Sequence, residues 1–332
     1  MHGVMSREDE AALAGPATPA SRLANIVVAL DGSDASRDAI AFAARIAASS
    51  GSRLHLVHAI ERLSCGPPSS VLDETRISEL LAFAERRLHE ERSGLRAGPA
   101  SSIECVRLGH PAAQVIAVAE ERKADLIVAG TRDRPGRHRL SEESTAGEIV
   151  CRSHVPVLVV HEGTHPSPRG AWLFRRPLVA VDYADASAAA LKTATLLARG
   201  NSVDVVHVIA EEPAPSTELT SRYARSRAMM SERSRLEQWI RATLGEPRRP
   251  SRAAVAIGQP DAALVDFAVG GGYDLVACGT HARRDRSPGQ CGSVAEALLD
   301  AVTCPVLVLR EATEPLDRSD PTPGIQVPPR GL

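Results

Sequence analysis

The chain has 332 residues, of which 43% are apolar, 3% aromatic and 24% charged, and its formal net charge at pH 7 is -2. This length suggests about two domains of roughly 150 residues each, in which helices and strands pack through small side chains. The charge excludes a chain-wide attraction to nucleic acid or anionic membranes, and no stretch approaches the roughly 18 apolar residues of a membrane-spanning helix.

We expect residues 1–22 to be disordered, and their acids stand where a signal peptide needs an apolar run, which predicts a cytoplasmic protein. From residue 23, short apolar runs bounded by Gly, Pro or Asp alternate with segments that show an apolar face at helical spacing. The predicted strands are 25–30, 53–60, 102–108, 125–130 and 156–160, and the helices between them are 35–50, 71–93, 111–123 and a segment from about Ser144.

The second part of the chain repeats the first. At an offset of 149 residues, "ADLIVAGT" (124–131) matches "YDLVACGT" (273–280), and "LGHPAAQVIAVA" (108–119) matches "IGQPDAALVDFA" (257–268). Near the start the offset is 151, where "IVVALDGSDAS" (26–36) meets "LVAVDYADAS" (178–187). A period of this length indicates a tandem duplication of one domain rather than a short-period solenoid.

Five strands joined by four crossovers predict an α/β fold in each copy, built from right-handed βαβ units. We expect two tandem, open, parallel five-stranded sheets with helices on both faces, in a Rossmann-like arrangement. The expected domains are residues 23–162 and 177–311, with a linker at 163–176 and a disordered, Pro-rich tail at 312–332.

Ligands in such a sheet bind at the carboxyl ends of the strands. In the second copy, "ACGTHARRDRSPGQCGS" (277–293) places a strand end, a small-residue turn, a basic loop and a Gly-Ser pair there. The candidate phosphate-binding residues of this segment are Gly279, Thr280, Ala282, Gly292 and Ser293.

Ser293 and Glu296 have the spacing of a capping box at the start of a helix. One interpretation is that Ser293 only caps this helix and that the arginines of the loop are solvated. The other is that the free backbone N–H groups and the helix dipole also hold a phosphate, which Gly292 allows to approach closely. The length of the loop between the two glycines favours phosphate binding.

The first copy is a degenerate version of this loop. It keeps Gly130, Thr131 and Ser144, but Asp133 and Glu143 replace small residues. A carboxylate about 4 Å from a phosphate costs on the order of 4 kcal/mol per charge pair at an effective dielectric near 20. We therefore expect the first copy not to bind a triphosphate.

An acid closes the first strand of each copy, Asp31 in the first and Asp182 in the second. Each could accept hydrogen bonds from a ribose or a base, or could cap the helix that follows. Tyr183 stands where the first copy has Gly32. Its ring could crowd a base or stack on it, and the sequence leaves both alternatives open.

At these residues the chain resembles the universal stress proteins in their tandem two-domain form, from about residue 24 to 310. The resemblance rests on the V-A-L-D-G-S and V-A-V-D openings, the G-x-P turns, the D-L-I-V-x-G-T strands and the C-P-V-L-V ending. Nucleotide-binding members of that family carry G-x-x-G-x(9)-G-[ST]. The second copy matches this pattern with Ala282 in place of one glycine, whereas the first has lost two of the three.

The resemblance implies a strand order of 3-2-1-4-5 and pairing of the two domains through their last strands, so that one chain imitates a dimer. It also implies a stress-response protein that binds ATP, with or without Mg²⁺, in the second domain without catalysis and acts through an unidentified protein partner. The alternatives are a nucleotide-free interaction scaffold and a slow ATPase. Further homodimerisation is compatible with each of them.

Other features are interpreted as structural. The six cysteines form no C-x-x-C pair, so we expect reduced thiols and no metal site. "HEGTH" (161–165) matches H-E-x-x-H, but a strand end and the helix breakers Gly163 and Pro166 argue against a zinc site. His58 and His207 lie at equivalent positions in apolar strands, which favours hydrogen-bonded structural histidines over general bases.

Overall fold

A computed structural model of the chain describes residues 23–61, 74–93, 101–132, 144–166, 173–210, 218–245, 252–280 and 291–310. The expected disordered segments 1–22 and 312–332 lie outside this part, as does 167–172 of the expected linker. Within the described part, no helix combines the length and the apolar character needed to cross a membrane.

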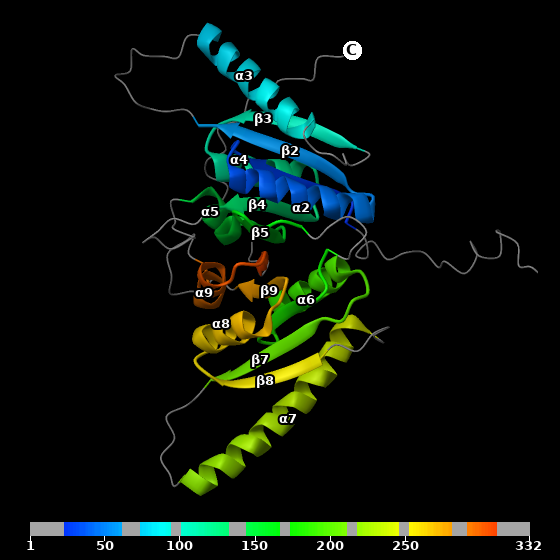
Figure 1. The fold of residues 1–332 in the computed structure, drawn as a ribbon, viewed down its shortest axis with the longest axis vertical. Helices are drawn as coiled ribbons and strands as arrows, with labels where there is room; N and C mark the ends of the chain where they lie inside the picture. The colour runs from blue at the N-terminus through cyan, green and yellow to red at the C-terminus, as the bar shows by residue number, and fades with distance from the viewer. Residues whose placement is uncertain are drawn as a thin grey trace, which may run out of the picture.

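Strands and helices alternate as expected in both repeats (Figure 1). The first repeat comprises β1 (Asn25–Leu30), α2 (Asp34–Ser50), β2 (Arg53–Ile60), α3 (Glu74–Ser93), β3 (Ser102–Leu108), α4 (Pro111–Glu121), β4 (Leu126–Thr131), α5 (Thr145–Arg152) and β5 (Val157–His161). The second comprises β6 (Pro177–Val181), α6 (Asp185–Ala198), β7 (Asp204–Ala210), α7 (Glu218–Leu244), β8 (Arg252–Gly258), α8 (Pro260–Gly271), β9 (Leu275–Thr280), α9 (Ser293–Ala301) and β10 (Val306–Arg310).

The described strands form one sheet of ten, in the order β3-β2-β1-β4-β5-β10-β9-β6-β7-β8. Each repeat has the expected order 3-2-1-4-5 with parallel pairing, so that prediction is confirmed. The two expected five-stranded sheets are continuous with each other, because β5 and β10 pair antiparallel and join the halves. The register opposes Val159 to Val306 and Val157 to Val308. The last strands therefore connect the repeats, as the resemblance implied.

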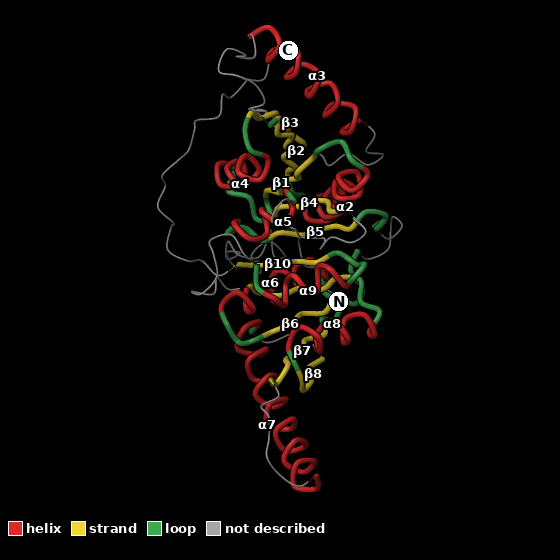
Figure 2. Tube along the Cα trace, turned by 90° about the vertical axis from the view of Figure 1, so that its left-hand side faces the viewer, coloured by secondary structure: helices red, strands yellow, loops and turns green. Residues whose placement is uncertain are grey.

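Helices cover both faces of this sheet (Figure 2). On one face α2, α3, α6 and α7 pack over a core that includes Ile40, Leu88 and Leu236. On the other face α4, α5, α8 and α9 pack over a core that includes Ile149 and Leu298. Both cores contain side chains from the two repeats, so the halves share a continuous apolar interior. At the far end of the sheet, α7 extends beyond β8 into solvent (Figure 1).

The two histidines of the 161–165 motif contact different parts of the chain. His161 is buried in β5, where its two ring nitrogens lie 3.1 Å and 3.0 Å from the carbonyl oxygens of Cys304 and Leu299. His165 instead contacts the Asp38 carboxylate of α2 at 3.0 Å. The two rings are thus held by different partners, one from each repeat. The prediction that His161 ends a strand is confirmed.

The equivalent histidines of the second strands are hydrogen-bonded to the backbone, as expected. Nδ1 of His58 lies 2.9 Å from the carbonyl oxygen of Leu30, and Nδ1 of His207 lies 2.8 Å from that of Val181. Each ring therefore ties the second strand of its repeat to the end of the first. This is a structural role.

His55, at the amino end of the sheet, is buried, and its Nε2 lies 3.2 Å from Asn25 Oδ1. Burial lowers the pKa of His55 to about 4, and the charges of Arg122 and Arg53 act in the same direction. The folded state thus disfavours the protonated ring, whereas the unfolded chain takes up its proton near pH 6.5. The stabilisation is complete above about pH 6.5 and is lost as the pH falls towards 4.

We predict that the free energy of unfolding decreases between pH 6.5 and 4, and that the decrease is smaller in His55→Gln. Urea unfolding followed by circular dichroism at a series of pH values measures both slopes. Equal slopes for the two proteins would assign the acid sensitivity to other groups.

Candidate functional site

The candidate site lies at the carboxyl ends of two neighbouring strands of the second repeat. Strand β6 ends just before Asp182, and β9 ends with Gly279 and Thr280. These strands pair directly, with Ala180 opposite Cys278, so Asp182 and Gly279 belong to the ends of neighbouring strands. Ala282 and the basic loop around it lie outside the described residues, as do Asp133 and Glu143 of the first repeat.

Helix α9 starts one residue earlier than expected. Its N-cap is Gly292, whose backbone N–H donates a 3.0 Å hydrogen bond to Thr280 Oγ1. Ser293 is already the first helical residue, so the predicted capping box of Ser293 and Glu296 is wrong. The bond from Gly292 to Thr280 explains the shift, because it fixes the chain at residue 292 in the extended conformation of an N-cap.

This shift distinguishes the two repeats at their last helices. In α5, the side chain of Ser144 is the N-cap and accepts a 3.0 Å hydrogen bond from the Gly147 N–H. In α9, the N-cap is Gly292, which has no side chain with which to cap the helix. Gly292 therefore offers the first-turn N–H groups no side-chain acceptor of its own, and the positive end of the helix dipole adds to their attraction for an anion. Glu296 lies in the same turn and contributes the opposing charge.

Packing explains why residues 279 and 130 are glycines, which the sequence alone did not reveal. A Cβ at Gly279 would come within 2.8 Å of the Ser187 backbone nitrogen in α6, and one at Gly130 within 2.3 Å of the Ala35 carbonyl oxygen in α2. Each glycine thus lets the first helix of its repeat pack onto the fourth strand. These two glycines are explained by packing rather than by a ligand.

The acids that follow the first strands accept hydrogen bonds within the turns that lead into the next helices. Asp182 Oδ1 accepts hydrogen bonds from the Ala184 N–H at 3.1 Å and from Ser187 Oγ at 2.6 Å. In the first repeat, Asp31 accepts from the Ser33 N–H at 2.9 Å. Ser33, rather than Asp31, is the N-cap of α2, and the N-cap of α6 is Ala184, without a side-chain cap. A ligand of Asp182 has to share its carboxylate with the donors of Ala184 and Ser187.

Asp31 also forms an ion pair with Arg132. The Arg132 guanidinium donates to Asp31 Oδ2 at 2.8 Å. Burial alone would raise the pKa of Asp31, but the hydrogen bonds from Ser33 and the charge of Arg132 outweigh it and hold the pKa below its ordinary value. In the first repeat, the carboxylate that would face a nucleoside is thus neutralised by the protein itself.

Tyr183 belongs to a cluster that the sequence analysis missed. Its φ is +68°, a left-handed conformation that costs a non-glycine residue about 1 kcal/mol. Its ring packs against His207 at 4.6 Å and against Trp239 at 5.7 Å, measured between centroids. The Arg235 guanidinium lies 4.3 Å from the ring centroid, and the phenol donates a 2.5 Å hydrogen bond to Glu232. These contacts offset the backbone cost.

These contacts fix the position of the Tyr183 ring in the structure. The ring is packed under α7, and burial and the adjacent Glu232 carboxylate raise the pKa of its phenol. No pattern in the sequence predicts the α7 residues of the cluster, Glu232, Arg235 and Trp239, because charged and polar residues also occupy many other positions of this helix.

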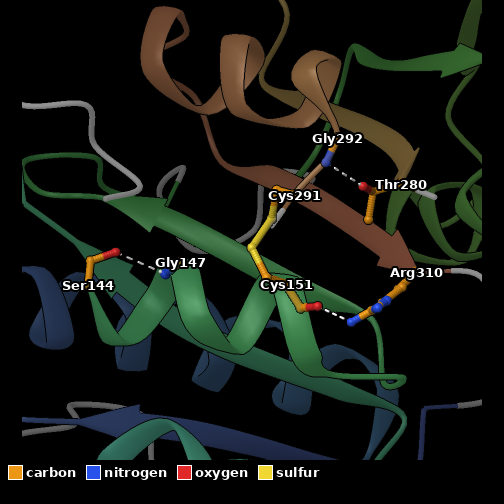
Figure 3. The surroundings of a disulfide bond; sticks show 7 residues. All are labelled: Ser144, Gly147, Cys151, Thr280, Cys291, Gly292 and Arg310. Atoms are coloured by element: carbon orange, nitrogen blue, oxygen red, sulfur yellow. Dashed lines mark hydrogen bonds between the residues drawn. A yellow bond between two sulfur atoms is a disulfide. The ribbon is translucent and has the colours of Figure 1, made fainter. Parts of the chain in front are cut away.

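A disulfide links the start of α9 to the first repeat (Figure 3). Cys291, immediately before Gly292, is bonded to Cys151 in the last turn of α5. The expectation that the thiols are reduced is wrong for this pair, which lies 140 residues apart and meets only because β5 and β10 bring α5 and α9 together. Arg310 also donates to the Cys151 carbonyl oxygen at this junction.

The other described cysteines carry free thiols, as expected: Cys105, Cys278 and Cys304. Cys65 lies outside the described residues. Burial raises the pKa of the Cys278 thiol to about 12, and the same cause raises that of Cys304 to about 12. These two sulfurs stay protonated and have little nucleophilic character at neutral pH.

A model of the universal stress protein family matches the chain twice, over residues 23–161 and 173–310. A universal stress protein of Methanocaldococcus jannaschii is 32% identical over 137 residues, which are 41% of this chain and 80% of that protein. One of Thermus aquaticus is 34% identical over 137 residues, or 41% of this chain and 96% of that protein.

Solved structures share the fold over most of the chain. A universal stress protein from Archaeoglobus fulgidus superposes with a TM-score of 0.59 at 19% identity, covering 86% of this chain and 98% of its own. A protein of unknown function from Pseudomonas aeruginosa gives a TM-score of 0.56 at 18% identity, covering 88% and 94%. At these identities the likeness concerns the architecture alone.

We predict that Gly279→Ala lowers the free energy of unfolding by roughly 1–3 kcal/mol, the usual cost of overpacking a tight contact. Gly270→Ala is the matched control, because a Cβ there meets nothing within 4 Å. Chemical denaturation measures both variants. A Gly279→Ala protein as stable as the control would contradict the close approach of α6 to β9.

We predict that Cys151→Ser destabilises the chain by up to about 5 kcal/mol, because the crosslink closes a loop of more than 100 residues. Adding a dithiol reductant should lower the unfolding midpoint of the wild type but leave that of Cys151→Ser unchanged. Mass spectrometry without reductant should show the wild type two mass units lighter than its reduced form. A reductant effect of equal size in both proteins would disprove this role of the bond.

Proposed function

The chain belongs to the universal stress protein family, and we propose that its second repeat binds an adenine nucleotide, ATP, without turning it over. The occupied or empty state of this site then alters contacts with a protein partner in a stress response. The proposal places the phosphates at the start of α9 and the nucleoside towards Asp182. It assigns one nucleotide to each chain.

The glycine N-cap of α9 is the observation that carries this proposal. Two equivalent helices begin at the same edge of the sheet, and only α5 satisfies its first turn with its own Ser144 side chain. A phosphate at α9 would accept hydrogen bonds from the first-turn N–H groups and interact favourably with the dipole. A Cβ at Gly292 would lie 2.9 Å from Thr280 Oγ1, so glycine also keeps this turn narrow.

The side chains at this edge suit binding better than catalysis. Thr280 accepts the hydrogen bond of Gly292, and Asp182 holds the start of α6. A nucleophilic mechanism requires an accessible hydroxyl or thiol beside a general base. Ser187 Oγ does contact the Asp182 carboxylate at 2.6 Å, but Ser187 is buried. The charge of the triphosphate is compatible with a bound Mg²⁺, and we assign that ion no protein ligand.

A nucleotide-free scaffold is the second candidate, and one observation favours it. The Tyr183 ring, held by His207, Trp239, Arg235 and Glu232, fills space between the end of β6 and α7. A base that entered beside Asp182 would have to lie next to this cluster or displace it. In the scaffold, the covalently joined repeats present a fixed surface and the start of α9 is solvated.

We predict that native mass spectrometry with millimolar Mg-ATP detects one nucleotide per chain. Gly292→Glu should abolish the complex, because its carboxylate lies at the helix start and reproduces the acid at residue 143 of the first repeat. Gly270→Glu adds the same charge on α8, where an added Cβ meets nothing within 4 Å, and should bind as the wild type does.

Three results would overturn the proposal. Absence of nucleotide from the wild type would leave the scaffold as the function. Binding that survives Gly292→Glu would place the phosphates elsewhere. Steady release of inorganic phosphate from Mg-ATP, measured in the same preparation, would make the protein an ATPase.

A further inference from the structure

A cavity of about 710 Å³ lies at the opposite end of the second repeat, at the amino ends of its strands. Arg176 precedes β6, Asp204 starts β7, Arg252 starts β8 and Tyr273 precedes β9. Because parallel strands begin at one edge of a sheet, these four positions come together away from the start of α9. The C-terminal parts of α7 and α8 complete the walls.

The cavity has an excess of positive charge. Four arginines and two carboxylates line it: Arg176, Arg233, Arg241, Arg252, Asp204 and Glu237. Glu237 is shared by Arg233 at 3.2 Å and Arg241 at 3.9 Å, and Asp204 accepts from the Tyr273 hydroxyl at 3.3 Å. Among the described residues, the guanidinium groups of Arg176 and Arg252 form no ion pair. Within the described part of the chain, these two positive charges have no carboxylate bonded to them.

The remaining walls are apolar and aromatic. The rings of Phe267 and Tyr273 stack with 6.1 Å between their centroids, and the Arg176 guanidinium lies 5.1 Å from the Tyr273 centroid. Ile240 contributes from α7, and Ala253 and Ala254 contribute small side chains from the edge strand β8. Burial and the Asp204 carboxylate raise the pKa of Tyr273, so its phenol remains a hydrogen-bond donor to Asp204.

The first repeat provides an internal comparison, because the duplication places different residues at the same positions. Asn25, Ile103, Val118 and Ala124 stand where the second repeat has Arg176, Arg252, Phe267 and Tyr273. At that edge, His55 contacts Asn25 and is kept neutral by burial. The fold therefore does not require arginines or aromatic rings at these four positions, although Arg53 and Arg122 lie near His55 elsewhere on that edge. Arg176, Arg252 and both rings are particular to the second repeat.

We propose that this cavity binds a small organic dianion with an aromatic body, of the aryl phosphate or aromatic dicarboxylate class. The anionic end would lie between Arg176 and Arg252, and planar guanidinium groups suit the paired oxygens of phosphate or carboxylate. The aromatic end would lie against Phe267 and Tyr273. The volume is within the range of about 300–1,000 Å³ that is usual for small-molecule sites. The proposal is independent of nucleotide binding at α9.

Isothermal titration calorimetry of the full chain with phenyl phosphate tests this site. The measurement is made in the presence of saturating Mg-ATP and also on Gly292→Glu, so that the start of α9 does not contribute. We expect one site per chain in both cases. Arg176→Gln and Arg252→Gln should each weaken binding at least tenfold, and Tyr273→Ala should weaken it as well.

Two controls separate a built site from general charge attraction. Arg227→Gln removes one exposed positive charge from α7 outside the cavity and should leave the affinity unchanged. Inorganic phosphate, which lacks the ring, should bind at least tenfold more weakly than phenyl phosphate. Circular dichroism of each variant checks that it is folded.

The proposal is wrong if phenyl phosphate does not bind at millimolar concentration. It is also wrong if Arg227→Gln weakens binding as much as the cavity variants do, or if inorganic phosphate binds equally well. Loss of binding in Gly292→Glu alone would move the ligand to the start of α9. That outcome would not count against the proposed nucleotide site. If ATP does not bind but phenyl phosphate binds normally, the proposed function is wrong and the inference about the cavity remains.

Discussion

The pairing of β5 with β10 is the interaction on which the architecture depends. Without it, each repeat would expose the backbone N–H and C=O groups of a buried, apolar edge strand, which is an unstable and aggregation-prone arrangement. With it, the sheet continues from one repeat into the other, and the two cores become shared. The contacts of His161 with the second repeat and the bond between Cys151 and Cys291 exist only because this pair sets the two halves in register.

The sequence predicted the features that arise from repeating patterns. Apolar runs of strand length, alternating with amphipathic segments, were sufficient for the α/β class, and the duplication made each assignment appear twice. The order of the strands and the pairing of the repeats came from the family resemblance. The hydrogen bonds of His58 and His207 followed from their equivalent places in buried strands. Each of these predictions rests on a pattern that extends over several residues.

The features that were missed depend on contacts between distant segments. Ser293 has the spacing of an N-cap, but a hydrogen bond from Gly292 to Thr280, twelve residues away, moves the helix start. Cys151 and Cys291 show no local pattern and meet only across the joined sheet. Gly279 fits a ligand-binding motif, yet the packing of α6 already explains it. The Tyr183 cluster combines one strand end with a helix about fifty residues later.

The disulfide has a consequence for the symmetry of the molecule. A dimer of two identical single-domain chains repeats every contact about its axis, so a cysteine pair of this kind would occur twice or not at all. Here the position equivalent to Cys151 in the second repeat is Asp300, and no second copy of the bond can form. Fusion into one chain has thus allowed the halves to differ. The second half starts its last helix at a glycine and has Arg176 and Arg252 in its cavity, whereas the first half starts its last helix at a serine and has Asn25 and Ile103 at the equivalent positions.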